Sequence, residues 1–192
     1  MQRKMYRKRT SRLPWLLIFA GLAFIWIWTD GLSWLEDHTQ KKRIDTTPVS
    51  GLDPAVLRAK NELVQQVRAK GIHMMITEGF RSPAEQDKLY NQGRTTAGKV
   101  VTQARGGESY HNYGLAIDFA IRTPDGGVVW DMKYDGNGNG IPDWSEIVTA
   151  AKALGFTWGG DWADFPDYPH LQMDFGLSIR DLQRGRRPPH ME

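Results

Sequence analysis

The stretch Leu115-Ala116-Ile117-Asp118-Phe119-Ala120-Ile121 carries the clearest strand signal of this 192-residue chain. Large apolar residues occupy every second position, and alanine, aspartate and alanine lie between them. Because side chains alternate between the two faces of a strand, the pattern predicts one face that packs on a core and one that carries Asp118. The small neighbours of Asp118 leave room beside its carboxylate for a ligand or an ion.

A second alternating stretch, residues 170–175, predicts a last strand with the same division of faces. Its three apolar residues fall on one side, and His170 shares the other side with Gln172. We therefore expect Asp118 and His170 both to lie opposite the apolar faces of their strands.

Capping signals predict helices around these strands, and the mixture indicates an α+β fold. The folded domain is expected to span residues 53–180. The expected elements are a helix from Asp53-Pro54 to before Gly71, a strand over residues 72–77, a helix from Ser82-Pro83-Ala84-Glu85 to near Gly93, an irregular loop over residues 94–107 and a helix over residues 144–154.

Charge and composition exclude several classes of function. The net charge is +3, but six of the 25 Lys and Arg residues precede residue 13, which leaves 19 against 22 Asp and Glu. The rest of the chain is therefore near neutral, and no nucleic-acid partner is predicted. The absence of cysteine excludes disulfides, thiol catalysis and cysteine-ligated zinc.

The N-terminal region has the pattern of a membrane anchor. A basic segment, residues 1–12, is expected to be cytoplasmic and precedes an apolar stretch assigned to a transmembrane signal anchor, residues 13–30. The uncharged part, residues 13–28, would form a helix of roughly 24 Å, so a cleaved signal peptide is the alternative and would make the protein secreted. A stalk over residues 31–52 and a basic tail over residues 181–192 complete the organisation, which predicts a single-pass protein of the cell membrane with its folded domain outside the cytoplasm.

Two histidines and two aspartates suggest a metal site. Catalytic zinc requires three nitrogen or oxygen ligands and one open position, and His111, Asp118 and His170 supply such a set. Asp167 lies three residues before His170 across a proline, where a carboxylate beside the metal can act as a general base. The alternative is a His111 that caps a turn and an Asp118 with a local partner.

Four blocks of sequence resemble the zinc peptidases of bacterial cell-wall peptides, the family of D-Ala-D-Ala carboxypeptidases and L-Ala-D-Glu endopeptidases. The resemblance covers residues 53–175 and is closest to the L-alanyl-D-glutamate endopeptidases. The blocks are SxHxxGxAxD from Ser109 to Asp118, DxxH from Asp167 to His170, Gly79-Phe80-Arg81-Ser82 with Glu85-Gln86, and Trp158-Gly159-Gly160-Asp161-Trp162.

This resemblance implies a small, mainly antiparallel sheet flanked by helices, as in the hedgehog and D-Ala-D-Ala peptidase folds. It implies zinc on the two histidines and Asp118, with Asp167 as general base. It also implies that Arg81 holds the scissile carbonyl oxygen or a substrate carboxylate; the alternative is a surface residue before a helix cap. Ser109 either contacts substrate or hydrogen-bonds its own loop, and Trp162 either lines the substrate groove or fills a gap in the core.

A second metal motif occupies residues 135–146, which match the pattern of a calcium-binding loop. The segment before it, residues 128–134, looks extended rather than helical, so we expect a lone loop with a structural Ca²⁺ ion. A plain Asn/Gly turn is the alternative. The expected calcium ligands are Asp135, Asn137, Asn139, the backbone carbonyl of Ile141, Asp143 and Glu146.

Together these features predict a membrane-anchored zinc endopeptidase that faces outward and cuts peptidoglycan stem peptides at the L-Ala-D-Glu bond. One alternative is a D-alanyl-D-alanine carboxypeptidase that uses the same site. Another is a non-catalytic wall-binding module that keeps the fold.

Overall fold

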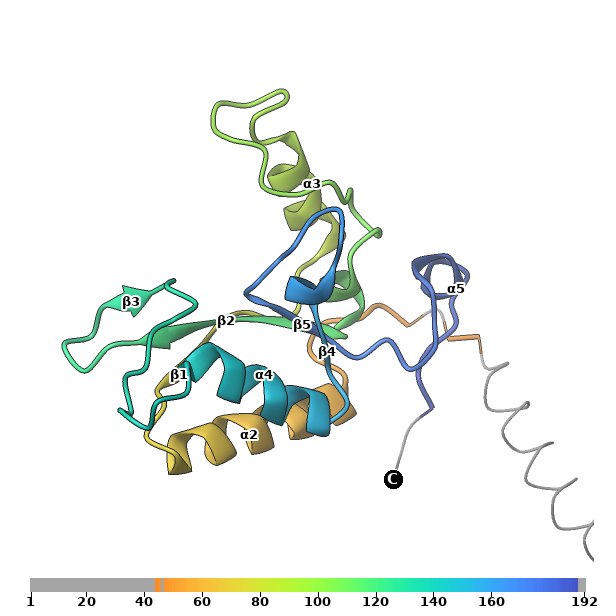
Figure 1. Ribbon diagram of the computed structural model, residues 1–192. Helices are drawn as coiled ribbons and strands as arrows, with labels where there is room; N and C mark the ends of the chain where they lie inside the picture. Colours follow the sequence, from red (N-terminus) through yellow and green to blue (C-terminus); the bar gives the residue numbers. More distant parts are fainter. Residues whose placement is uncertain (1–43, 46, 190–192) are drawn as a thin grey trace, which may run out of the picture. The chain divides into compact units, whose positions relative to one another are not determined.

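The computed structural model describes residues 44–45 and 47–189, and these fold around one antiparallel sheet (Figure 1). The strand order is β1-β2-β5-β4, and β3 pairs with the far end of β2. The strands are β1 Met74–Glu78, β2 Ala116–Arg122, β3 Val128–Val129, β4 Thr157–Trp158 and β5 His170–Gln172. The helices are α2 Pro54–Ala69, α3 Pro83–Asn91, α4 Asp143–Ala153 and α5 Ile179–Gln183, with short 3-10 helices η1 Tyr110–Tyr113 and η2 Gly159–Asp161.

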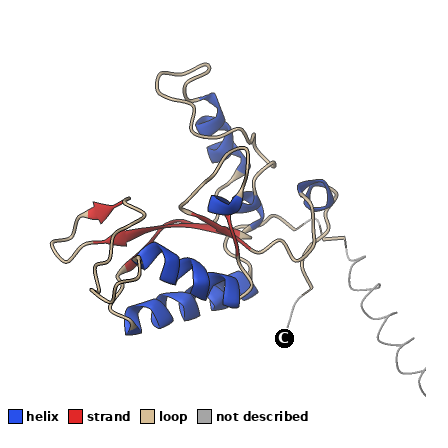
Figure 2. Ribbon diagram, viewed as in Figure 1, coloured by secondary structure: helices blue, strands red, loops and turns tan. Residues whose placement is uncertain are grey.

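Two helices, α2 and α4, cover one face of the sheet (Figure 2). The four large apolar residues of the stretch 115–121 point into this layer and are at most 1% exposed. Phe119 packs against Trp144 of α4 with ring centroids 4.7 Å apart. The alternation seen in the sequence thus forms the core, as predicted.

The predicted helix starts are confirmed and have local causes. Asp53 caps α2 by accepting a hydrogen bond from Ala55 N–H, and Pro54 occupies the first turn, where its missing N–H costs nothing. Ser82 and Glu85 form the expected reciprocal capping box at the start of α3. The α+β class and the antiparallel sheet are likewise confirmed.

The other face of the sheet carries the second layer, which contains α3, η1 and the long loops (Figure 1). Asp118 of β2 pairs directly with His170 of β5 and, on its other side, with Glu78 of β1. The backbone register therefore fixes Asp118 and His170 as neighbours before any side chain is considered.

One predicted strand is shorter than expected. The stretch 170–175 is extended over His170–Gln172 alone. Phe175 and Gly176 both have positive φ, at 52° and 72°, so the backbone turns there and cannot continue a strand. The prediction of a strand up to residue 175 was therefore wrong at its C-terminal end.

The two ends of the described chain lie against the folded domain. Ile44 pairs with Arg186, and the Asp45 N–H donates to the carbonyl oxygen of Gly185. Leu182 is 1% exposed and Pro188 is also buried, so part of the predicted basic tail, residues 181–192, packs on the domain. Within residues 44–45 and 47–189, no helix combines the length and the apolar character needed to cross a bilayer, and the predicted anchor lies outside these residues.

Candidate metal centre

Three side chains from separate elements meet at one point above the sheet. His111 comes from η1, Asp118 from β2 and His170 from the start of β5. Oδ1 of Asp118 lies 3.3 Å from Nε2 of His111 and 3.2 Å from Nδ1 of His170, and these two nitrogens are 3.2 Å apart. The sequence prediction that the three side chains converge is confirmed.

This spacing fits a zinc ion. With bonds of about 2.0–2.1 Å, the ligand atoms of a tetrahedral site lie roughly 3.3 Å from one another. The three measured distances have this length, and they leave one vertex of the tetrahedron for water or substrate. Among the described residues, these three side chains form the cluster of His and acidic groups whose possible ligand atoms all lie within 4.8 Å of one another.

Each imidazole ring is oriented by a hydrogen bond through the nitrogen that faces away from the other two ligands. Nδ1 of His111 lies 2.7 Å from the carbonyl oxygen of Gly79, directly after β1, and Nε2 of His170 lies 3.0 Å from Oε1 of Gln172. When these ring nitrogens carry the protons, Nε2 of His111 and Nδ1 of His170 keep their lone pairs for a metal. The two histidines therefore use different ring nitrogens.

The loop around His111 is held in place by a cap and a glycine. The side chain of Ser109 accepts a hydrogen bond from His111 N–H at the start of η1. Gly114 ends the helix with φ of 69°, a left-handed conformation that glycine adopts at little cost. A Cβ atom at Gly114 would also overlap the carbonyl oxygen of Gly51, so a larger residue would displace the chain on both sides.

Asp118 and His170 shift each other's pKa values. Burial raises the pKa of Asp118, but hydrogen bonds from His111 and His170 outweigh it and hold this pKa well below its usual range. Burial lowers the pKa of His170, but the hydrogen bond to Asp118 and its negative charge, with the hydrogen bond to Gln172 and the charge of Asp167, together raise this pKa above its usual value. Asp118 therefore stays ionised and offers an anionic oxygen to a cation.

Asp167 lies in a loop beside the ligands. Its backbone N–H donates to the carbonyl oxygen of Gly159, and a Cβ atom at Gly159 would lie 2.5 Å from the Asp167 carbonyl oxygen and 3.0 Å from Cβ of His170. Only glycine allows this approach. Burial, together with the negative charge of Asp118, raises the pKa of the Asp167 carboxyl above its ordinary value.

Arg81 is anchored on three sides. One terminal nitrogen, Nη2, lies 3.3 Å from Oε2 of Glu78 and 3.8 Å from Oδ2 of Asp118. The other, Nη1, donates to Oε1 of Gln86, a side chain of α3 that is fully buried. Arg81 therefore directs a fixed positive charge at the edge of the metal centre and is not a freely exposed surface residue.

A groove of about 740 Å³ opens over the centre, and the ligands, Arg81 and Asp167 all line it. Ser109 and Trp162 line it as well, and the Trp162 ring lies 5.1 Å from the His170 ring. Trp162 is 39% exposed and so is not a core residue, whereas Trp158 is partly buried and donates its ring N–H to the Tyr168 carbonyl.

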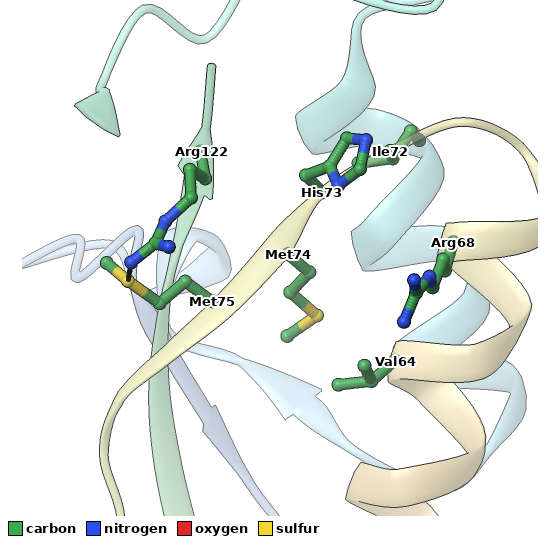
Figure 3. A pocket seen from close by; sticks show the side chains of 7 residues that line it. All are labelled: Val64, Arg68, Ile72, His73, Met74, Met75 and Arg122. Carbon is green, nitrogen blue, oxygen red and sulfur yellow. Dashed lines mark hydrogen bonds between the residues drawn. The ribbon is translucent and has the colours of Figure 1, made fainter. Parts of the chain in front are cut away.

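A second hollow, of about 330 Å³, lies between α2 and β1 (Figure 3). Arg68, His73 and Arg122 line it, and Arg122 contacts the sulfur of Met75 at 3.1 Å. No carboxylate is among its lining residues. This hollow therefore lacks the acidic ligands that the groove over β2 provides.

The sequence predicted the three metal ligands but not the groups that orient them and Arg81. Gln172 was placed on the correct face of its strand without a role. Gln86 was noted as part of a resemblance, although its position one turn after the Ser82 cap was a usable signal that it faces back toward Arg81. The Gly79 carbonyl oxygen has no sequence signature, since every residue has one.

Two imidazoles and a carboxylate around one point, with another carboxylate in the same groove, define the centre of a metallopeptidase. Comparison with known proteins agrees. A family model described as D-alanyl-D-alanine carboxypeptidase matches residues 102–173. The peptidoglycan L-alanyl-D-glutamate endopeptidase CwlK of Bacillus subtilis (strain 168) is 58% identical over 138 residues, which make up 72% of this chain and 83% of the Bacillus protein.

The chain therefore belongs to the D-alanyl-D-alanine carboxypeptidase family of zinc-dependent metallopeptidases, which includes L-alanyl-D-glutamate endopeptidases. The L-alanyl-D-glutamate peptidase of Listeria phage A118 is 32% identical over 120 residues, 61% of this chain and 36% of the phage protein. Among solved structures, the L-Ala D-Glu endopeptidase ChiX of Serratia marcescens is 24% identical with a TM-score of 0.48, over 69% of this chain and 84% of ChiX. That score is too low to support a conclusion by itself.

Proposed function

We propose that the protein is a zinc-dependent peptidoglycan endopeptidase that cuts stem peptides between L-Ala and D-Glu. The metal assignment is supported by the spacing of His111, Asp118 and His170. The choice of bond is supported by one observation, the 58% identity to an L-alanyl-D-glutamate endopeptidase over most of that enzyme's length.

The chain's own groups have distinct roles in this proposal. His111, Asp118 and His170 hold the zinc ion, which supplies Lewis acidity beside the scissile carbonyl group. Asp167, whose pKa is raised, takes a proton from the attacking water and later passes it to the leaving amine. Arg81 donates hydrogen bonds to the carbonyl oxygen as it gains negative charge. Ser109 and Trp162 contact the peptide along the groove.

Two substitutions separate metal binding from proton transfer. We expect His111→Ala to lose both zinc and cleavage, since one of three ligands is removed. We expect Asp167→Ala to keep zinc but lower kcat by about 10²–10⁴-fold, the usual contribution of a general base. Zinc content by elemental analysis and turnover on defined muropeptides measure the two effects.

Asp164→Ala is the matched control, because Asp164 is an exposed aspartate of the same loop. It should keep both zinc and turnover. Wild-type activity in Asp167→Ala would remove the base assignment while leaving the metal site intact.

A D-alanyl-D-alanine carboxypeptidase is the second candidate, because the matching family model has that description. Mass spectrometry of the digested muropeptides distinguishes the two. A cut after L-Ala supports the endopeptidase, and loss of the terminal D-Ala supports the carboxypeptidase. A protein with bound zinc that cleaves neither bond would instead be a wall-binding module.

We also propose that residues 13–30 anchor the enzyme in the cell membrane with the domain outside. Support comes from the basic residues that precede this apolar stretch and from the wall substrate proposed above. Protease treatment of intact spheroplasts should digest the domain, and its complete protection would contradict this placement.

A further inference from the structure

The loop 135–146 follows Tyr134, includes the first turn of α4 and contacts the end of α2. None of its residues lines the groove of the zinc centre. We propose that this loop binds one structural Ca²⁺ ion, which fastens the C-terminal end of α2 to the N-terminal end of α4. The site is separate from the peptidase chemistry and needs none of its ligands.

The strongest observation is a buried carboxylate oxygen that lacks a hydrogen-bond partner. Asp143 is 2% exposed, and its Oδ2 accepts a hydrogen bond from Gly136 N–H of the loop. Its Oδ1 is buried and has no hydrogen-bond partner within the described part of the chain. A buried charge without a partner is costly, and a metal ion is one of the few groups that satisfies it. Asp143 occupies the ninth position of the calcium motif.

The second acidic ligand, Glu146, already accepts hydrogen bonds from three donor groups. It is 7% exposed, and its Oε2 accepts from Nδ2 of both Asn137 and Asn139, each at 2.9 Å. Its Oε1 lies 3.2 Å from Nζ of Lys70. Three N–H donors from separate positions thus crowd the carboxylate where a cation would sit. A bound cation would take the place of these donors at the Glu146 carboxylate.

The remaining ligand positions are arranged around the same turn. Asp135 accepts from the N–H groups of Asn139 at 3.1 Å and Gly140 at 2.8 Å, which curls the loop back over its first residue. Gly140 stands at the sixth position, where calcium loops require glycine for a sharp turn, and has φ of 85°.

The donor chemistry selects the ion. The site offers carboxylate, amide and backbone carbonyl oxygens with no nitrogen or sulfur ligand, which suits Ca²⁺ and not zinc. Of the three carboxylates, Glu146 forms an ion pair with Lys70, and no other ion pair to them is found within the described part of the chain, so the loop retains net negative charge. With three acidic ligands and two neutral amides, we expect a dissociation constant of about 10⁻⁴–10⁻³ M, the range of extracellular calcium modules.

The consequence concerns stability and not turnover. The loop joins the two helices that cover the core face of the sheet, since Nδ2 of Asn137 donates to the Lys70 carbonyl at the end of α2 and Asp143 begins α4. Bound calcium should therefore oppose separation of α2 from α4. The zinc ligands stand on the other face of the sheet and should be unaffected.

Calorimetric titration of the full-length, zinc-loaded protein with CaCl₂ tests the proposal. We expect one Ca²⁺ per chain, a rise in Tm of about 3–5 °C at ten times the dissociation constant, and unchanged kcat. Asp143→Asn and Glu146→Gln should each weaken calcium binding at least tenfold while zinc content stays at one per chain. Asp131→Asn, an exposed aspartate just before the loop, is the control and should bind as wild type does.

Lys70→Met gives a test of opposite sign. Removing the cation that competes for Glu146 should tighten calcium binding. A loop without a calcium site predicts the same calcium titration for Lys70→Met and the wild type. Absence of binding to the wild type at 10 mM Ca²⁺ would overturn the proposal, and so would equal binding by Asp143→Asn and the wild type. Loss of cleavage in the His111 variant has no bearing on this result, so the two sites can fail independently.

Discussion

At the scale of single residues, the metal centre depends on atoms behind its ligands as much as on the ligands. His111 and His170 present different ring nitrogens, and each is set by one acceptor, the Gly79 carbonyl or the Gln172 side chain. If either acceptor is lost, the ring can rotate or change tautomer, and the lone pair no longer points at the metal.

Gln172→Leu should therefore weaken zinc binding by about 10–100-fold, the usual effect of losing such a support. The size of the side chain is nearly kept, and Gln172 is 8% exposed, so the fold should survive. Competition with a fluorescent zinc chelator measures the affinity. Gln66→Leu, on the exposed side of α2, serves as control, and equal affinities in the two variants would show that Gln172 does not orient His170.

The sequence predicted residues best where the signal is local. Asp118 and His170 could be placed on the non-core faces because strand alternation is a property of a few neighbours. His111 was proposed as the third ligand from zinc chemistry and then from the resemblance, but not from local periodicity, since η1 is held by the tertiary contact between Gly114 and Gly51. The role of Arg81 came from the resemblance alone, because its approach to Asp118 joins segments 37 residues apart in the sequence.

At the scale of elements, η1 shows how a four-residue helix delivers a ligand. Ser109 begins it, Gly114 ends it, and the Gly114 carbonyl accepts a hydrogen bond from Asp53 N–H at the start of α2. The 3-10 helix η1 therefore lies between β2 and the segment before α2. Its glycine meets two separate demands, a left-handed φ and a close backbone neighbour.

Gly114→Ala and Gly126→Ala should separate these two demands. Both positions have positive φ, 69° and 90°, but a Cβ atom at Gly126 would meet no atom within 4 Å. We expect Gly126→Ala to lower the free energy of unfolding by about 1 kcal/mol, from backbone strain alone. Gly114→Ala should cost clearly more and should also lower zinc affinity. Urea titration of both variants measures the difference, and equal losses would mean that the contact with Gly51 is unimportant.

Elements were predicted well where capping residues mark their ends and poorly where a backbone turn ends them. Helices α2 and α3 begin at the residues that the Asp-Pro and Ser-Pro patterns indicated. β5 ends early because Phe175 adopts a left-handed φ. Hydrophobic alternation cannot reveal such a turn, since the apolar side chains at residues 173 and 175 pack on the core in either conformation.

At the scale of the whole molecule, the zinc ligands connect two distant parts of the chain, residues 111–118 and His170. His111 and His170 are separated by 59 residues in sequence, and between them runs β2, which pairs with three other strands. An ion held by all three ligands is present in the folded chain and absent from the unfolded one, so zinc binding adds directly to stability.

Removal of zinc with a chelator should therefore lower Tm, by about 6 °C or more if zinc is supplied at a hundred times its dissociation constant. The His111→Ala protein should show no such difference, since it no longer binds the ion. Scanning calorimetry with and without chelator, at constant calcium, measures both. The same drop in His111→Ala would place the stabilising metal elsewhere.

The groove is built from two kinds of structure. Its floor consists of side chains on β2, β5 and η1, whereas much of its rim comes from residues 101–104 and from Trp162 and Phe165 in connecting loops. Loops accept sequence change and insertion far more readily than sheet residues do. A protein engineer could therefore vary Val101, Trp162 and Phe165, and so retune which peptide is accepted, while Asp167 and the hydrolytic centre beneath the rim stay as they are.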